Sequence, residues 1–208
     1  MKDWKLRTAP YSEQMKGWPQ AGKHILAQFD DDTIIVYQAY RPEIGRFAVE
    51  KGYFGGEFKY SRMSWIKPNF LWMMYRSQWG LAEGQEVVLA VRLKRKFFDS
   101  LLAHAVPSSF DTDAFGSRDE WAAAVANSDV RRQWDPDHMP NGQKCERRAV
   151  QLGLRGATLE AYGQREIVEI IDMSAFVAEQ RKNVADWKDG KLITPTEDVY
   201  VPCTNGDQ

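Results

Sequence analysis

The sequence predicts an α+β fold: a single compact domain with a mixed or antiparallel central sheet, flanking helices and one buried helix rich in Trp and Met. Residues 33–40 and 85–93 are β-branched and apolar over most of their length, as buried strands are. Residues 70–75 are apolar on every side, which is typical of a helix enclosed by the core. Strands and helices are expected without strict alternation, which favours α+β over a doubly wound sheet.

The N-terminal part of the chain is punctuated by Pro and Gly. Residues 1–20 are expected to form an extended arm, and residues 22–29 a short helix before the first strand. Arg41-Pro42 ends the strand at 33–40, which should be central in its sheet, because the residue before proline is pushed out of the helical region. A helix follows, and Gly52 is its expected C-cap.

The rest of the chain consists of short segments with the periodicity of strands or helices. The strand at 165–172 is apolar even at adjacent positions, so it is expected inside the sheet rather than at its edge. Residues 203–208 are expected to form a flexible tail. The remaining expected elements are helices at 96–105, 118–127, 156–162 and 174–181 and strands at 130–138 and 149–154.

Composition limits the classes of function. A chain of 208 residues is long enough for one substantial core, and its net charge of −1 gives no bulk attraction to nucleic acid or to an acidic membrane. Cys145 and Cys203 have no paired spacing, which indicates a reducing compartment. Neither a signal peptide nor a membrane helix is found, so a soluble, cytoplasmic protein without a membrane partner is expected. The oligomeric state is left open.

Several familiar chemistries have no matching motif. The sequence lacks a phosphate-binding loop, a Gly-x-Gly-x-x-Gly turn and a Gly-x-Ser-x-Gly elbow. His24, His104 and His138 are isolated in sequence, so no metal is expected. What remains is a set of Arg, Lys, Tyr, Gln, Trp and carboxylate side chains, which suits catalysis by positioning and electrostatics.

Four segments supply that set. Arginines would bind phosphates through two parallel N–H donors, and aromatic rings would stack on a flat ligand. A carboxylate from residues 164–169 would stabilise an oxocarbenium-like sugar. Alternation along a strand places Gln164 and Glu166 on one face and Glu169 on the other. The candidate ligand-binding residues are Tyr37, Gln38, Tyr40, Arg41, Arg62, Trp65, Lys67, Arg76, Gln133, Trp134 and Asp135. The alternative is structural: strand caps, a core helix, an Asx-turn and surface ion pairs.

The stretch 61–77 is the most distinctive of the four. Pro68 suits a first helical turn, and a helix extending back past it would place Trp65, Asn69, Trp72 and Arg76 on one face. Buried charge without a partner is expensive, so the cations that bracket the apolar run must meet carboxylates or an anionic ligand.

The same segments resemble those of the domain-of-unknown-function family 4291. The resemblance is carried by 36–40, 62–68, 70–77, 133–136 and 151–154, within a match from about Val36 to Asp172. The sequence departs from the family at Asp137-His138, where an acidic residue followed by arginine is expected. The family name assigns no activity, so this resemblance implies a shared fold and no particular chemistry.

The order of motifs also resembles the ADP-ribosyltransferase fold, which splits NAD at the nicotinamide bond. That resemblance implies that Glu166 stabilises the oxocarbenium ion, with Ser64 and either Gln38 or Arg41 holding NAD. Tyr37, Tyr40 or Trp65 would stack on nicotinamide. The catalytic candidates are Ser64, Glu166 and Glu169.

Three functions follow as hypotheses. The first is an ADP-ribosyltransferase that uses NAD to modify an unidentified acceptor, either nucleic acid or protein. The second is a protein that binds or processes a nucleotide-like small molecule or a nucleic acid, with phosphates on Arg62, Lys67, Arg76, Arg147, Arg148 and Arg155 and bases on Trp65, Trp72 or Trp134. The third is a non-catalytic interaction module. A cleft shared by Gln38, Arg62, Ser64 and Glu166 favours the first, a continuous basic groove the second, and dispersed buried motifs the third.

Overall fold

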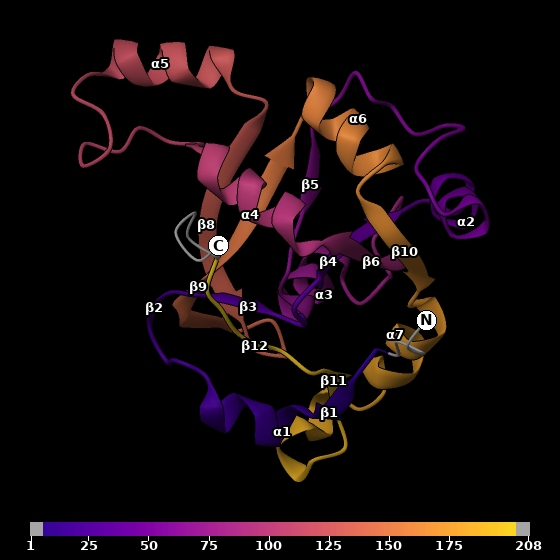
Figure 1. Cartoon of the computed structure of the whole chain (residues 1–208). Helices are drawn as coiled ribbons and strands as arrows, with labels where there is room; N and C mark the ends of the chain where they lie inside the picture. Colours follow the sequence, from indigo (N-terminus) through magenta and orange to yellow (C-terminus); the bar gives the residue numbers. More distant parts are fainter. Residues whose placement is uncertain (1–5, 203–208) are drawn as a thin grey trace.

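Two ladders of strands carry the fold (Figure 1), and a backbone bridge joins them. In the computed structural model, which describes residues 6–202, one antiparallel sheet has the order β10-β6-β4. A second has the order β2-β9-β8-β7, with β5 also paired to β9, and two further sheets of two strands each are β1-β11 and β12-β3. Tyr37 on β4 and Lys67, just after β5, exchange backbone hydrogen bonds of 2.6 and 3.3 Å. The chain is therefore α+β, as predicted, but its strands form several sheets instead of one central sheet.

The strands and helices are mostly short. The larger strands are β4 (Thr33–Tyr40), β6 (Val87–Lys94), β8 (Val130–His138), β9 (Lys144–Leu154) and β10 (Ile167–Asp172). The shorter strands are β1 (Thr8–Pro10), β2 (Gly22–Lys23), β3 (Ile25–Ala27), β5 (Ser64–Ile66), β7 (Val106–Pro107), β11 (Ile193–Pro195) and β12 (Asp198–Tyr200). The α-helices are α1 (Tyr11–Gln14), α2 (Pro42–Lys51), α3 (Phe70–Ser77), α4 (Arg95–His104), α5 (Arg118–Asn127), α6 (Gly156–Gln164) and α7 (Ser174–Arg181).

The β4–β6 ladder is buried on both faces. Ile34 and Val36 point into a core shared with α4, α6 and strand β9, whereas Ile35 and Tyr37 point into a second core with α1, α3 and α7. Alternation along one strand thus sends its side chains into two different cores. This double burial explains why β4 is apolar almost throughout, and it fixes the end of the strand against α3.

Helix α3 lies in the second core and is anchored at its N-terminus. Phe70 to Met74 are at most 7% exposed, so the predicted burial of this run is confirmed up to Met74. Asn69 is the N-cap, and its side-chain oxygen accepts from Trp72 N at 2.7 Å. Pro68 therefore precedes the cap, and Trp65 lies on β5, so the predicted shared helical face of Trp65 and Asn69 is wrong.

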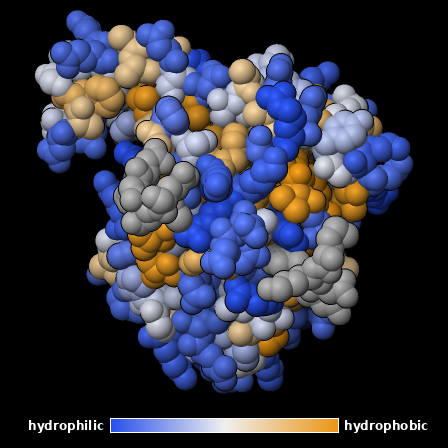
Figure 2. All heavy atoms as spheres, viewed as in Figure 1, coloured by the Kyte–Doolittle hydropathy of each residue, from blue (hydrophilic) through white to orange (hydrophobic). Residues whose placement is uncertain are grey.

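Helix α5 stands apart from the two cores, at the upper left of Figure 1. None of its residues is buried, and its side chains show almost no segregation into an apolar and a polar face. Its C-terminal carbonyl groups accept hydrogen bonds from Arg131 and Arg155, which tie it to the end of the β8–β9 ladder. The face of the molecule in Figure 2 is mainly hydrophilic, with separate apolar patches.

Tertiary pairing overturns four of the sequence predictions. Strand β4, expected to be central in its sheet, lies at the edge of the order β10-β6-β4, and besides β6 it pairs among the described residues only through the isolated bridges Phe29–Ile34 and Tyr37–Lys67. Residues 22–29 form β2 and β3 instead of a helix, because β9 and β12 supply them with strand partners. The expected arm packs instead of extending in its described part, since Tyr11 is 1% exposed. Strand β10 is an edge strand that pairs with β6, and Val168 is 46% exposed. The expected tail at 203–208 lies outside the described residues.

Candidate functional site

Lys67 is the most unusual charged residue of the fold. It is 5% exposed, at the bridge between the two sheets, and its ammonium group makes no hydrogen bond or ion pair with any residue that the structure describes. Burial, with the nearby Arg76 guanidinium adding to it, lowers the pKa of Lys67 to about 8, and Asp135 partly opposes the change. Burying a lysine costs folding free energy unless a carboxylate pairs with it.

Arg76 brings a second cation to the same place. It lies in the last turn of α3, is exposed, and has no salt bridge among the described residues. The C-terminal dipole of the helix favours a cation there, yet two neighbouring cations repel each other. Lys67 and Arg76 together therefore form a small positive site without a fully compensating anion.

Two amides hold Asp135, whose charge acts on Lys67. Its carboxylate accepts from Gln133 Nε2 at 2.8 Å and from Gln151 Nε2 at 2.7 Å, across the β8–β9 ladder. Trp65 lies over Gly153 of the same ladder, where a Cβ atom would sit 3.0 Å from the indole ring. The amides fix the carboxylate in place without neutralising it. We call Lys67, Arg76 and Asp135 the Lys67 cluster.

An aromatic stack borders the Lys67 cluster. The His138 imidazole lies 3.6 Å from the Tyr75 ring centroid and 5.3 Å from that of Trp72, with both planes within 11° of its own. Both ring nitrogens of His138 and Trp72 Nε1 are buried without a hydrogen-bond partner among the described residues. Burial lowers the pKa of His138, which keeps the ring neutral at pH 7. Three unpaired polar atoms in one place are typical of a site that a ligand or water completes.

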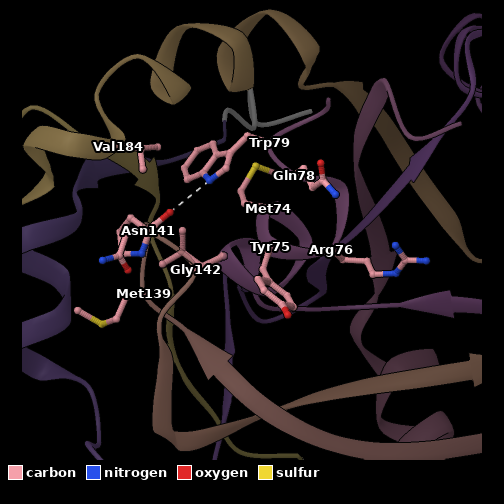
Figure 3. Close-up of a pocket in the computed structure, with 11 residues that line it drawn as sticks. Met74, Tyr75, Arg76, Gln78, Trp79, Met139, Asn141, Gly142 and Val184 are labelled. Carbon is pink, nitrogen blue, oxygen red and sulfur yellow. Dashed lines mark hydrogen bonds between the residues drawn. The ribbon is translucent and has the colours of Figure 1, made fainter. Parts of the chain in front are cut away.

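A pocket of about 610 Å³ adjoins the stack, between the C-terminal end of α3 and the turn after β8 (Figure 3). Met74, Trp79 and Met139 give it an apolar lining, and Asn141 adds an amide. Trp79 Nε1 donates to the carbonyl oxygen of Pro140 at 3.3 Å, which ties the two sides together. Tyr75 and Arg76 also line it, so the pocket and the Lys67 cluster share the end of α3.

The backbone beside this pocket is strained. Gln78 and Trp79 have φ angles of 51° and 56°, and Gly80 follows at 74°. Left-handed backbone costs a non-glycine residue on the order of 1–3 kcal/mol and persists only where surrounding contacts hold it. Arg181 Nη1 donates to Trp79 O at 2.9 Å, and Trp79 N donates to Met74 O at 2.8 Å. These contacts hold the Trp79 indole in the pocket wall.

Three sequence candidates meet in a different place, on the opposite face of β4. Gln38 Nε2 donates to Tyr40 Oη at 2.8 Å and to Ser64 Oγ at 2.9 Å, and its Oε1 accepts from Tyr162 Oη at 2.5 Å. Gln38 is 2% exposed. The network satisfies its own members, so it leaves little hydrogen-bonding capacity for a ligand.

Glu166 and Glu169 lie away from that network. Glu166 pairs with Lys94 at 3.2 Å, and Lys94 is opposite Thr33, at the other end of β4 from Gln38. Five residues of strand separate the two positions, about 17 Å. Glu169 pairs with Arg92 at 3.5 Å. Gln164 belongs to α6, so the predicted strand alternation of Gln164 with Glu166 is wrong.

The other predicted ligand residues are scattered. Arg41 pairs with Glu57, and Arg62 is exposed with no salt bridge among the described residues. Tyr37 is buried beside Phe70, and Trp134 packs against the first core. Of the six cations expected to bind nucleic acid, Arg147 is buried on Asp137 and Arg155 binds α5 carbonyl groups. The sequence candidates that come together at the new site are Lys67, Arg76, Gln133 and Asp135.

Comparison with known proteins supports the family resemblance of the sequence. Residues 24–200 match the model of the domain of unknown function DUF4291. The chain belongs to the DUF4291 family. A search of curated proteins finds no match. The match covers the whole described site of this DUF4291 domain, including Lys67, Arg76, Asp135 and the pocket.

Sequence reasoning did not name several residues of the site. Tyr75, Trp79 and Asn141 look like ordinary core or turn residues, and only the fold brings them to one pocket. His138 was named only as isolated in sequence, although it stacks on α3. Among residues 6–202 no group of three metal-ligating side chains is found, and no helix is long and apolar enough to span a membrane.

Proposed function

We propose that this chain binds a nucleotide-like small molecule, with its phosphate on Lys67 and Arg76 and its flat ring in the pocket beside Trp79. The observation that carries the proposal is the buried Lys67, whose ammonium group has no partner in the part of the chain that the structure describes. Burying an unpaired lysine lowers the stability of the fold. A protein keeps such a lysine when an anionic ligand pairs with it in the functional state.

The two cations suit a phosphate better than a carboxylate of the protein. Arg76 presents a planar fork of donors, and Lys67 adds a point charge from inside a low-dielectric wall. Asp135 adds a negative charge that partly opposes the lowering of the pKa of Lys67. An entering phosphate would also relieve the repulsion between the two cations.

The pocket suits a single flat ring. Its volume of about 610 Å³ lies inside the range of about 300–1,000 Å³ that is usual for small-molecule sites. The apolar lining offers stacking and burial, and Gln78 and Asn141 provide amides for the ring edge. Figure 3 shows the Arg76 side chain extending away from Trp79 and Asn141, so ring and phosphate would occupy adjacent places.

ADP-ribosyl transfer from NAD stays a prediction from the sequence. Its expected residues divide between the saturated Gln38–Ser64–Tyr40 network and Glu166, so the Lys67 cluster favours nucleotide binding as the first function to test. The nucleic-acid hypothesis also stays a prediction. The engagement of Arg147 and Arg155 within the fold favours a small ligand over a strand of nucleic acid.

The test is a ligand screen by thermal shift and calorimetry. The probes are AMP, ADP, ADP-ribose and NAD, with adenosine as the ligand without phosphate and a short oligonucleotide as the long ligand. We expect stabilisation by the phosphorylated small molecules and none by adenosine. A ligand at 100 times its dissociation constant adds about 2.7 kcal/mol to the free energy of unfolding. Stabilisation by the oligonucleotide alone would contradict the proposal.

Three variants locate the binding site. Lys67→Met removes the charge at nearly constant shape and should abolish phosphate-dependent binding. Arg76→Lys keeps the charge but loses the fork, so affinity should fall by about tenfold. Lys96→Met is the matched control, because Lys96 is exposed on α4 and makes no ion pair among the described residues. Equal binding by Lys67→Met and the wild type would overturn the assignment.

A further inference from the structure

The strained turn after α3 gives the pocket a feature that the rest of the described chain lacks. Gln78 and Trp79 have φ angles of 51° and 56°, and every other residue with positive φ among residues 6–202 is a glycine. Non-glycine residues are held in left-handed backbone at a cost, and they cluster at ligand sites. Both residues line the same pocket of about 610 Å³, so this strain lies in the pocket wall.

Gln78 is the more unusual of the two residues, because it ends a helix. It is the C-cap of α3, and its N–H donates to Tyr75 O at 3.3 Å. A left-handed residue that ends a helix is usually glycine, as Gly52 is at the end of α2 with a φ of 75°. A glycine at position 78 would form the same turn with less strain. Ending the helix therefore does not require the Gln78 side chain.

The Gln78 amide is free to bind a ligand. Gln78 is exposed, and its side chain makes no hydrogen bond with any residue that the structure describes. The other polar groups of the pocket are engaged: Trp79 Nε1 donates to Pro140 O at 3.3 Å, and Asn141 Oδ1 accepts from Gln143 N at 3.1 Å. Figure 3 shows Gln78 and Asn141 on opposite sides of the Trp79 indole. Gln78 thus offers the pocket both a donor and an acceptor.

A primary amide recognises a ring edge that carries a donor beside an acceptor. Adenine presents such an edge at N6–H and N7, and glutamine binds this pair of atoms with two hydrogen bonds in nucleic-acid recognition. The corresponding edge of guanine presents two acceptors, O6 and N7, which two donors from arginine match better. The chemistry of Gln78 therefore favours adenine among the bases.

We propose that Gln78 reads the N6–N7 edge of an adenine base bound against Trp79. The inference rests on the proposed nucleotide site and names the base that it selects. Gln78 Nε2 donates to N7, and Gln78 Oε1 accepts from N6–H. The turn is fixed before the ligand enters, because Trp79 N donates to Met74 O at 2.8 Å and Arg181 Nη1 donates to Trp79 O at 2.9 Å. A preformed wall reduces the freedom that is lost on binding.

The experiment measures base preference by isothermal titration calorimetry on the full chain. The probes are ADP, GDP and 7-deaza-ADP, in which a C–H group replaces N7. We expect ADP to bind about tenfold more tightly than GDP and several-fold more tightly than 7-deaza-ADP, the scale of a bidentate pair and of one hydrogen bond. Gln78→Ala removes the amide, so the three affinities should become equal. Gln78→Arg should favour GDP, because its two donors match O6 and N7.

A stability measurement separates a strained binding residue from a structural one. Gln78→Gly removes both the strain and the amide. Its equilibrium constant for unfolding should be about threefold to tenfold lower than that of the wild type, and its preference for ADP should be lost. Gly52→Gln is the matched reverse change, at a C-cap where an added Cβ would meet no other element within 4 Å. It should raise the unfolding constant by a similar factor.

The outcomes distinguish the base assignment from the site itself. Equal binding of ADP and GDP by the wild type, or a preference for ADP that survives in Gln78→Ala, overturns the assignment and leaves the nucleotide site standing. A less stable Gln78→Gly variant would show that the side chain supports the fold, and also overturns it. Absence of binding by ADP, GDP and every other phosphorylated probe overturns both the assignment and the proposed function.

Discussion

Lys67 makes the stability of the protein depend on pH in the direction opposite to that of a lysine in an ion pair, whose pKa is raised. Its folded-state pKa of about 8 lies below the usual 10.5, so between these values the unfolded chain binds more protons than the folded one. The free energy of unfolding should therefore rise with pH across that window. Below about pH 8 both states are protonated, and the full penalty for burying the charge remains.

The variant Lys67→Met tests this penalty. At pH 7 it should be more stable than the wild type by about 3 kcal/mol, since the pKa falls from 10.5 to about 8 and each unit of depression corresponds to about 1.4 kcal/mol. The difference should shrink towards zero near pH 10.5. Denaturant unfolding of both proteins at several pH values measures it. A variant less stable than the wild type at pH 7 would show that Lys67 stabilises the fold.

Glu166 tests the hypothesis of ADP-ribosyl transfer directly. The change Glu166→Gln removes the charge but keeps the size of the side chain, and its ion pair with Lys94 is at the surface, so folding should change little. If the chain transfers ADP-ribose from NAD through this residue, NAD cleavage should fall by on the order of 10²–10³-fold, the scale for one electrostatic stabiliser. Glu169→Gln is the control, since Glu169 pairs separately with Arg92. Unchanged NAD cleavage in both variants would contradict the hypothesis of ADP-ribosyl transfer.

Helix α3 connects the site to the rest of the fold through its N-terminus. Asn69 caps the helix and also donates to Glu197 Oε2 at 3.3 Å, while Phe70 N donates to Glu197 Oε1 at 2.6 Å. Burial raises the pKa of Glu197, which is 3% exposed, despite that backbone hydrogen bond. The position of Tyr75 and Arg76 therefore depends on contacts made two turns away.

The N-cap can be tested against a matched one. Asn69→Ala should lower the free energy of unfolding by about 1–2 kcal/mol, because it removes the cap of a buried helix and a contact to Glu197. Ser117→Ala removes a similar cap from α5, whose residues are not buried, and should cost less. Equal losses in the two variants, measured by denaturant unfolding, would mean that α3 is no more central than α5.

The elements that sequence predicted best are those with local signals. Residues 33–40, 118–127, 130–138 and 174–181 were expected with the bounds that the structure gives them, and the helix after Arg41 ends at Gly52 in the left-handed conformation. Residues 22–29 failed because their strands exist only through distant partners. Strand β10 was placed inside the sheet because apolar composition does not reveal which strand lies at an edge.

The site was partly predictable for the same reason. Lys67, Arg76, Gln133 and Asp135 were singled out because their residue types suit phosphate binding. Sequence could not tell which cation lacks a carboxylate, because that depends on three-dimensional neighbours. Arg147 lies on Asp137, whereas no carboxylate of residues 6–202 pairs with Lys67. Gln38, Tyr40 and Ser64 do come together, but they satisfy one another.

The molecule as a whole combines the β4–β6 ladder, which is buried on both faces, with an exposed segment at residues 108–129. Strands β4 and β6 have almost every residue buried, between two cores. Residues 108–129, with α5 among them, contain no buried residue, and α5 stands out from the two ladders in Figure 1. Segments with few buried apolar contacts open at lower free energy than the core. The site lies on the core side, since α3 packs against β4 and β8.

Amide hydrogen exchange should resolve these two parts. We expect the amides of α5 to exchange through local opening, at a free energy several kcal/mol below that of β4 and β6, whose amides should exchange only through global unfolding. Adding denaturant should leave exchange in α5 nearly unchanged and accelerate exchange in β4 steeply, because only global opening exposes much new surface. Amides of α3 should behave like those of β4, and ADP-ribose should slow exchange around Tyr75 and Arg76 without affecting α5. Uniform protection over α5 and β4 would mean that residues 108–129 unfold together with the core. The arginine contacts at the C-terminal end of α5 would then stabilise it as much as buried side chains stabilise β4.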